Sequence, residues 1–280
     1  MLTDKCDMNL SDFLSQVKRL LTNSCHNFAR DIHEEHQRPC PVCVLALYLM
    51  AIENLVDGNK ESYDIEIIKT YCRDTYKPID AYNIQLTPEN SSQMGKDLWA
   101  LALLQKVEEC SSRNDYESGL SKCIRRLEEN ESYVLGLLLW LFPQFATIDR
   151  IQLVENMTMG NRAWMWQDKM LFWIACIRDS NYDKGKARNI ETQICNLQLD
   201  SGAFSTVEDK ARKGNLSSSA IGLMALVSCV KYNGSKCIAD DAVLKTVRWI
   251  VTNLNASQDI DETSRAWALY SLSEFINLSK

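Results

Sequence analysis

Apolar residues recur at every third or fourth position along most of the chain, and alternation with a period of two is rare. This spacing is typical of α-helices that bury one face. The pattern therefore predicts an all-α protein with helices at residues 10–29, 41–57, 61–75, 94–110, 116–129, 131–142, 147–157, 162–178, 184–198, 216–232, 239–254 and 262–276.

Successive helices in this series alternate in character. Residues 133–142 and 219–230 are apolar on nearly every face, whereas residues 120–128 and 243–254 keep a polar stripe. A helix that is apolar all round is buried, and one with a polar stripe lies at the surface. The centres of the apolar helices are about 44 residues apart, which indicates a repeat of outer–inner helix pairs.

Six such pairs can form an open array or a closed ring. An open solenoid needs polar capping helices at both ends, but residues 266–275 are as apolar as the central helices. Closing the pairs into a ring buries every inner helix. We therefore predict an α6/α6 toroid in which residues 1–280 form a single domain. An irregular helical bundle or an open array is the alternative.

One loop and the helix starts fit this pairing. Residues 198–204 (QLDSGAF) connect an outer helix to an inner one, and Gly202 is expected to adopt a positive φ. Short polar residues before two inner helices are expected to cap them, Asp261 or Thr263 in one case and Ser217 or Ser218 in the other.

Composition narrows the classes of function. The chain has 280 residues, of which 46% are hydrophobic and 24% charged, and its net charge is −6. It has no basic stripe for a phosphate backbone, so we expect no nucleic-acid partner. Since no apolar run approaches the roughly 18 residues that a transmembrane helix needs, we expect no membrane span.

Two counts favour a secreted, extracellular protein. The charged residues 1–25 do not resemble a signal peptide, so the chain is either intracellular or the mature form of a secreted protein. The 11 cysteines favour disulfides in an oxidising compartment, and their odd number leaves at least one thiol unpaired. Asn-x-Ser/Thr occurs more than three times as often as the roughly 2.4 occurrences expected by chance, which favours N-glycosylation. An intracellular chain rich in Asn and Ser, with buried thiols, is the alternative. The sequons are at Asn9, Asn90, Asn130, Asn156, Asn215, Asn233, Asn255 and Asn277.

The loop at residues 198–204 and the inner helix that follows it carry a family resemblance. A Q-x3-G-x-aromatic loop that leads into such a helix resembles those of squalene and diterpene cyclases, protein prenyltransferase β-subunits, complement thioester domains and the transcobalamin/intrinsic factor carriers. Residues 214–226 (GNLSSSAIGLMAL) look most like the cobalamin carriers' G-N/D-x-Y-S-T-x-L-A-L/M-Q-x-L stretch. Residues 93–104 (QMGKDLWALALL) are similar to a second carrier segment.

This resemblance implies a carrier protein without enzymatic activity. Asn215 matches a ligand-contacting Asn of the carriers, while Lys96 replaces their ligand-contacting Gln and Ser217 replaces their Tyr. The resemblance also implies a link from Cys6 to Cys237. The implied partners are a small hydrophobic or amphipathic molecule, such as a corrinoid, and a protein receptor.

A toroid places a ligand site at one end of its inner helices. Parallel inner helices gather their N-termini at that end, with unpaired N–H groups and the positive ends of the helix dipoles. Aromatic walls with a few polar groups are typical of small-molecule sites. For the tryptophans, packing in the core is the alternative. The predicted ligand-binding residues are Lys96, Asp97, Tyr133, Trp164, Trp166, Asp168, Asn215, Ser218, Arg265 and Trp267.

Two other motifs offer alternatives. His33, His36, Cys40 and Cys43 could hold zinc, but the second C-x2-C that usually completes such a site is absent, so we expect neither a metal nor a cofactor. Residues 259–263 (DIDET) resemble the D-x-D-D-T-A motif of class II terpene cyclases, which donates a proton to an alkene. Carboxylates at a helix start are also ordinary caps.

Enzyme activity is therefore uncertain from the sequence, with the balance against it. The alternative functions are a cyclase-like enzyme using Asp259, Asp261 and Glu262, and a protein-interaction module that resembles a thioester domain without its reactive G-C-G-E-Q motif, which is absent here.

Overall fold

The computed structural model describes residues 10–34, 40–56, 63–75, 91–107, 121, 124–125, 134–159, 166–206, 213–233, 239–256 and 259–278. These residues form α-helices, one 3-10 turn at Pro143–Phe145 (η1) and one isolated β-bridge, with no strand among them. The all-α prediction is thus confirmed. The helices are α1 (Leu10–Glu34), α2 (Val42–Leu55), α3 (Tyr63–Thr75), α4 (Ser91–Val107), α6 (Leu135–Leu141), α7 (Ile148–Met159), α8 (Trp166–Arg178), α9 (Lys184–Leu197), α10 (Leu216–Asn233), α11 (Ala239–Ala256) and α12 (Glu262–Leu278).

The predicted helix bounds agree with the structure to within a few residues at most ends. The largest difference is at the end of α1, which continues to Glu34 instead of residue 29 because Ile32 extends its buried stripe. The predicted helix at 116–129 lies mostly outside the described residues, although Ser121 and Ile124 are helical.

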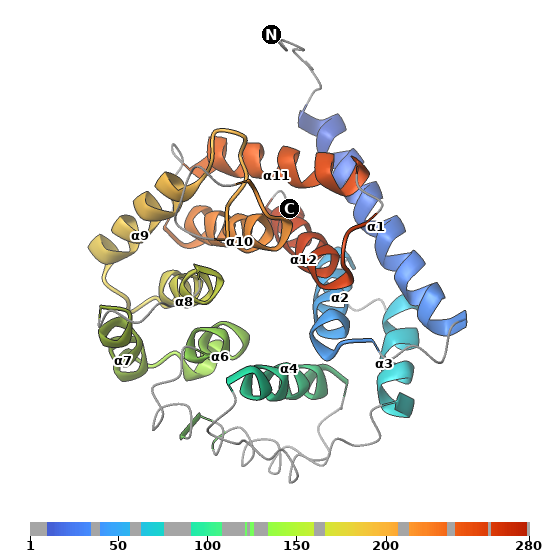
Figure 1. The fold of residues 1–280 in the computed structure, drawn as a ribbon, viewed down its shortest axis with the longest axis horizontal. Helices are drawn as coiled ribbons and strands as arrows, with labels where there is room; N and C mark the ends of the chain where they lie inside the picture. The colour runs from blue at the N-terminus through green and yellow to red at the C-terminus, as the bar shows by residue number, and fades with distance from the viewer. Residues whose placement is uncertain are drawn as a thin grey trace.

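The helices lie in two concentric layers (Figure 1). The inner helices are α2, α4, α6, α8, α10 and α12, and the outer helices are α1, α3, α7, α9 and α11. Each inner helix contacts the next one in the series, and α12 contacts α2. The first and last inner helices are therefore neighbours, although most of the sequence separates them.

Burial follows the hydrophobic pattern of each helix. In the inner helices, residues 44–49 of α2 and 266–273 of α12 are buried without interruption. In the outer helix α1, buried residues recur every third or fourth position from Phe13 to Ile32. The buried side chains of all the described helices join in one core. The predicted division into buried and amphipathic helices is confirmed for α1, α2 and α12.

Polar contacts at both ends of α2 and α12 show that these two helices run parallel. Near their N-termini, the Cys43 side chain of α2 lies close to Thr263 of α12. Near their C-termini, Asn54 Nδ2 donates to Ser273 Oγ at 3.0 Å. Since start meets start and end meets end, the two helices share one direction.

The loop after α9 is fixed by a glutamine. Gln198 Nε2 donates to the Ala242 carbonyl at 2.8 Å and to Thr246 Oγ1 at 2.7 Å, and Thr246 Oγ1 donates to the Gly202 carbonyl at 2.9 Å. These bonds join the loop to α11. Gly202 has φ +90°, as the sequence predicts.

One predicted cap is confirmed and one is wrong. Asp261 Oδ1 accepts from the Ser264 N–H at 2.9 Å and caps α12. The helix α10 begins at Leu216, as the spacing predicts, but its cap is Asn215, whose Oδ1 accepts from the Ser218 N–H at 3.0 Å. Ser217 and Ser218 therefore lie inside α10.

Replacing Gly202 with alanine is expected to lower the free energy of unfolding by about 2–3 kcal/mol. A Cβ atom there would lie 2.5 Å from the Lys245 carbonyl oxygen, and the positive φ disfavours any side chain. Urea unfolding measures the change. Gly95→Ala is the control, since its Cβ meets nothing within 4 Å. Equal stability of the two variants would contradict this description of the loop.

Candidate functional site

Side-chain contacts join the N-terminal ends of four inner helices. Ser217 Oγ of α10 lies 2.8 Å from Ser264 Oγ of α12. Gln167 Nε2 of α8 donates to Ser218 Oγ of α10 at 3.1 Å. With the contact between α2 and α12, these bonds place the starts of α2, α8, α10 and α12 together. We call this end the mouth, defined by Cys43, Gln167, Ser217, Ser218, Thr263 and Ser264.

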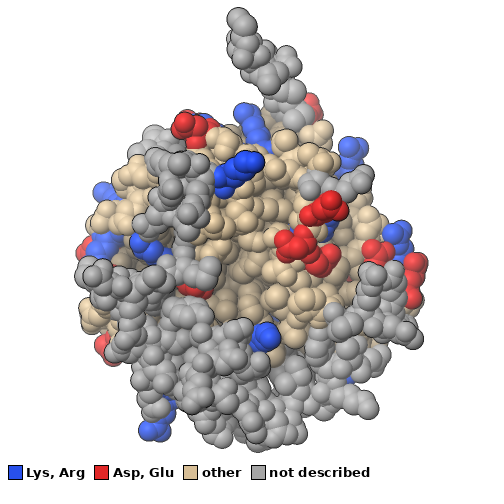
Figure 2. Space-filling model, in the orientation of Figure 1, with Lys and Arg blue, Asp and Glu red and all other residues tan. Residues whose placement is uncertain are grey.

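The mouth carries mostly uncharged polar groups, and acidic side chains lie beside it. Asp259, Asp261 and Glu262 are exposed at the start of α12. On the face seen in Figure 2, uncharged side chains cover most of the described centre, and one group of acidic side chains stands out. Hydroxyl and amide groups can both donate and accept hydrogen bonds, so such a surface suits a polar, uncharged part of a ligand.

Several predicted ligand-binding residues lie in the first turns of inner helices. Ser218 is buried at the mouth, while Asp168, Asn215 and Arg265 are half-buried at the starts of α8, α10 and α12. Lys96 of α4 is exposed. The helix positions of Asp97 and Trp166 are described but their side chains are not, and Tyr133 and Trp164 lie outside the described residues.

Trp267 is placed differently from the prediction. Its side chain is 8% exposed, and its ring centroid lies 5.6 Å from that of Trp99 and 5.4 Å from that of Trp140. The α12 register turns Trp267 towards the core, so packing, the alternative considered for the tryptophans, describes its position better than an open wall of the mouth.

This aromatic group brings together three inner helices. Trp99 of α4, Trp140 of α6, and Trp267 and Tyr270 of α12 form what we call the tryptophan cluster. Trp140 is 2% exposed, and its Nε1 has no hydrogen-bond partner in the part of the chain that the structure describes. Its ring lies edge-on to those of Trp99 and Tyr270, a favourable geometry for aromatic pairs.

The close approach of α6 and α8 positions Asp168. A Cβ at Gly136 would lie 2.7 Å from the Asp168 carbonyl oxygen, so this crossing requires glycine.

Burial raises the pKa of the Asp168 carboxyl from its usual 3.8 to about 6. Because the folded protein binds this proton more tightly than the unfolded chain, the stability that Asp168 contributes is fully present below pH 4. It is lost as the pH rises to about 6.

Asp168→Asn is expected to make the protein more stable by about 1–3 kcal/mol at pH 8, because asparagine avoids the cost of a buried charge. The advantage should shrink as the pH falls through 6 and disappear below 4. Thermal unfolding of both proteins between pH 3.5 and 8 measures this. A stability difference that does not change with pH would contradict the assigned burial of the carboxylate.

Neither the Asp261 carboxyl nor the Cys40 thiol is activated for catalysis. Hydrogen bonds from Ser264 lower the pKa of Asp261 and favour its charged form, whereas an acid that protonates an alkene must keep its proton. Burial raises the pKa of Cys40 to about 12, so its thiol is not an activated nucleophile. Glu262 Oε1 accepts from the Tyr48 hydroxyl at 3.0 Å, which fits a structural role.

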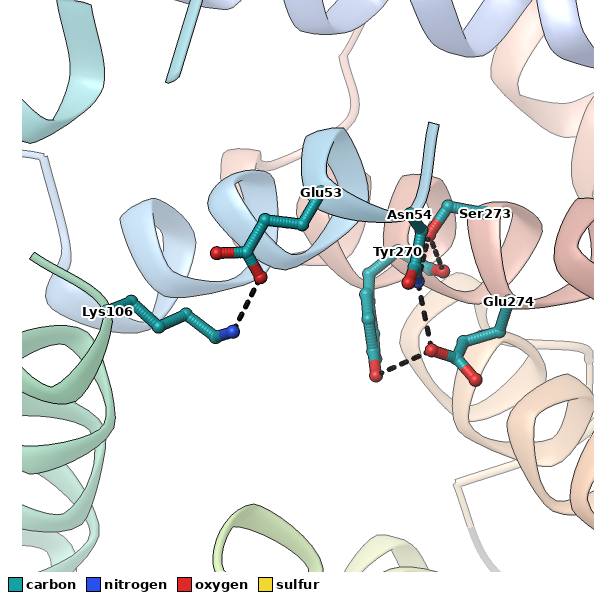
Figure 3. A network of polar contacts seen from close by, with 6 residues as sticks. All are labelled: Glu53, Asn54, Lys106, Tyr270, Ser273 and Glu274. Carbon is teal, nitrogen blue, oxygen red and sulfur yellow. Dashed lines mark hydrogen bonds and ion pairs between the residues drawn. The ribbon is translucent and has the colours of Figure 1, made fainter. Parts of the chain in front are cut away.

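A second polar group lies at the opposite end of the inner helices (Figure 3). Glu274 Oε1 accepts from Asn54 Nδ2 at 2.9 Å and from the Tyr270 hydroxyl at 3.1 Å. Arg178 Nη2 lies 3.8 Å from Glu274 Oε2, and Lys106 is paired with Glu53. These contacts connect the ends of α2, α4, α8 and α12. We call the set the Glu274 network: Glu53, Asn54, Lys106, Arg178, Tyr270, Ser273 and Glu274.

The sequence analysis missed the Glu274 network, although a signal was present. Glu274 is a single carboxylate in the apolar run of α12 at residues 266–275, and Glu53 and Asn54 end the apolar run of α2. A lone charge in a buried helix needs a partner.

The remaining features considered in the sequence are the zinc candidates, the cysteines and membrane-spanning helices. Within the described ranges, no group of three or more His, Cys, Asp or Glu side chains is arranged to hold a metal ion, and His36 lies outside them. Free thiols in the described part of the chain include Cys25, Cys43, Cys72, Cys176, Cys195 and Cys229, while Cys6 and Cys237 lie outside the described residues. Among the described helices, none combines the length and the apolar character needed to cross a bilayer.

Comparisons of the chain with models of protein families, with curated proteins and with solved structures found no match.

Proposed function

We propose that the protein is a non-enzymatic binding protein that holds a small amphipathic molecule at the mouth of an α6/α6 toroid. The observation that supports this most is the cycle of contacts among the inner helices, in which α12 returns to α2. A closed ring of parallel helices directs all their N-termini to one opening, and the hydrogen bonds of Ser217 and Ser218 join three of those N-termini.

The chemistry of the mouth supports an uncharged polar group on the ligand. Ser217, Ser264 and Gln167 offer hydroxyl and amide groups, and the helix starts add N–H donors. An apolar part of the ligand would be directed towards the buried core of the ring. A corrinoid is one such molecule, as in the cobalamin carriers that parts of the sequence resemble, and a protein receptor would be the second partner.

We further propose that the protein is secreted and carries N-glycans. Two sequon residues on outer helices support this, since Asn156 of α7 and Asn255 of α11 are exposed. At both positions a glycan would project away from the inner helices. Asn215 is half-buried and caps α10, so its side chain already has a structural role.

Two alternative functions would use other features of the molecule. A protein-interaction module would use the outer helices and leave the mouth empty. A cyclase-like enzyme would need a protonated acid near Asp261, and the lowered pKa of that residue speaks against it.

Ligand binding can be tested on protein secreted from eukaryotic cells. Native mass spectrometry is expected to show a small molecule that co-purifies with the chain, and added cyanocobalamin tests the corrinoid version. An unchanged absorption spectrum and melting temperature with cyanocobalamin would exclude corrinoids, while a co-purifying molecule would still support a carrier.

A pair of variants locates the site. Ser217→Trp is expected to fill the mouth and reduce occupancy by the co-purifying molecule at least about tenfold, because the indole would displace the polar end of the ligand. Thr252→Trp places the same group on an exposed position of the outer helix α11 and should leave occupancy unchanged. Equal occupancy in both variants, or no small molecule in any sample, would contradict the proposal.

A further inference from the structure

Two buried N–H groups without an acceptor belong to residues around the Glu274 carboxylate. In the part of the chain that the structure describes, Trp140 Nε1 and Arg178 Nε are the buried side-chain atoms that have no hydrogen-bond partner. The Trp140 ring centroid lies 5.9 Å from that of Tyr270, whose hydroxyl donates to Glu274 Oε1 at 3.1 Å (Figure 3). Arg178 Nη2 lies 3.8 Å from Glu274 Oε2. Trp140 and Arg178 therefore both contact the Tyr270–Glu274 pair.

These two donors need acceptors from outside the chain. A buried N–H group that has lost its water and gained no acceptor lowers the stability of the fold. Trp140 is 2% exposed, and an indole can donate a hydrogen bond but cannot accept one. A molecule that brings oxygen acceptors to this point would satisfy both groups.

The distance between Arg178 and Glu274 indicates which kind of oxygen fits. At 3.8 Å, Arg178 Nη2 and Glu274 Oε2 face each other without a direct hydrogen bond. A hydroxyl beside both atoms can accept from Nη2 and donate to Oε2, whereas a carbonyl or a carboxylate has no hydrogen to donate. Polar contacts of this length are commonly bridged by such an oxygen.

The charges at this end of the inner helices favour an uncharged molecule. Arg178 and Lys106 are balanced by Glu274 and Glu53. An anion would meet the negative ends of the helix dipoles, because α2, α4, α8 and α12 end here. A cation would meet the two basic side chains.

We propose that this end of the inner helices is a second binding site, at which Trp140, Arg178 and Glu274 bind the hydroxyl groups of a small uncharged polyol such as a monosaccharide. The site can be reached from solvent, since the side chains of Arg178 and Glu274 are 19% and 17% exposed. It lies at the opposite end from the mouth and does not rest on the proposed function.

NMR of the indole groups tests the proposal on the full chain. Protein with 15N-labelled tryptophan gives one indole signal per ring, and the Trp140 signal is the one missing from W140F. D-glucose at up to about 100 mM, which detects a millimolar Kd, is expected to move the Trp140 signal downfield along a saturating curve. The signal of Trp249 on the outer helix α11 should not move. Tetrahydropyran, which has the sugar ring without its hydroxyls, should leave Trp140 unchanged.

Two arginines provide matched variants. R178K keeps the charge but removes the planar set of N–H donors, so the Kd for glucose is expected to rise at least about tenfold. R150K is the control and should leave the Kd unchanged, because Arg150 is half-buried on the outer helix α7. Circular dichroism verifies that each variant is helical. If R178K is unfolded, E274Q replaces it and should weaken binding similarly, since an amide nitrogen cannot accept the hydroxyl hydrogen.

Several results would overturn the proposal. These are a Trp140 signal that glucose does not move, an equal shift with tetrahydropyran, a larger shift with sodium acetate, and an unchanged Kd in R178K. A contact between the Trp140 N–H and a bound water that persists at the highest glucose concentration would also overturn it. None of these results concerns the mouth, so the two proposals can fail separately.

Discussion

Replacing Glu274 with alanine is expected to lower the free energy of unfolding by about 3–5 kcal/mol. Its carboxylate accepts hydrogen bonds from Asn54 and Tyr270 and lies near Arg178, so one side chain joins α12 to α2 and α8. Alanine would leave the buried Tyr270 hydroxyl without its acceptor and the Arg178 guanidinium without its charge partner. Both groups would then have lost water without compensation.

A second glutamate provides the control for this variant. Glu155 accepts from the Tyr182 hydroxyl at 2.6 Å and from Lys186 Nζ at 3.0 Å, but the Lys186 side chain is 57% exposed. Water can replace the Lys186 contact, so Glu155→Ala should cost only about 1–2 kcal/mol. Urea unfolding at pH 7 measures both. Similar losses for Glu155→Ala and Glu274→Ala would show that the Glu274 network does not hold the inner helices together.

Replacing Trp140 with alanine is expected to lower the free energy of unfolding by about 3–5 kcal/mol. Its ring contacts those of Trp99, Trp267 and Tyr270, which come from two other inner helices. A cavity at this point would remove packing from α4, α6 and α12 together. Since the centre of the tryptophan cluster is enclosed, the neighbouring rings cannot close the gap without moving their helices.

Two further variants test whether the loss of stability comes from the enclosed position of the Trp140 ring. One keeps an aromatic ring at that position, and the other removes a tryptophan from an outer helix. Trp140→Phe keeps an aromatic ring and removes the Nε1–H, which has no partner among the described residues, so it should cost less than half as much as alanine. Trp249→Ala removes a half-buried ring from the outer helix α11 and should cost about 1–2 kcal/mol. A loss below 1 kcal/mol for Trp140→Ala would contradict the placement of its ring at the centre of the cluster.

The helices and their layers could be predicted because both follow from hydrophobic spacing. The runs at 44–49 and 266–273 have no polar face, and both are buried in inner helices. Local backbone conformation could also be predicted where one residue type is strongly preferred. Examples are the positive φ of Gly202 and the helix cap at Asp261. In α10 the same reasoning chose the wrong cap, because Asn215 and the serines that follow are all good capping residues.

The contacts between distant segments could not be predicted in this way. Trp267 lies on a helix with no polar face, so the pattern alone does not show which of its neighbours it meets. The Glu274 network depends on the ends of α2, α4, α8 and α12 coming together, and these helices are far apart in the sequence.

The most direct test of the arrangement is a double-mutant cycle between Tyr48 and Glu262. The Tyr48 hydroxyl of α2 donates to Glu262 Oε1 of α12 at 3.0 Å, which is a contact between the first and last inner helices. Unfolding of Tyr48→Phe, Glu262→Gln and the double variant gives the coupling free energy. A coupling of at least about 0.5 kcal/mol is expected if α12 lies beside α2. A coupling indistinguishable from zero, with both single variants folded, would contradict the closed cycle of inner helices.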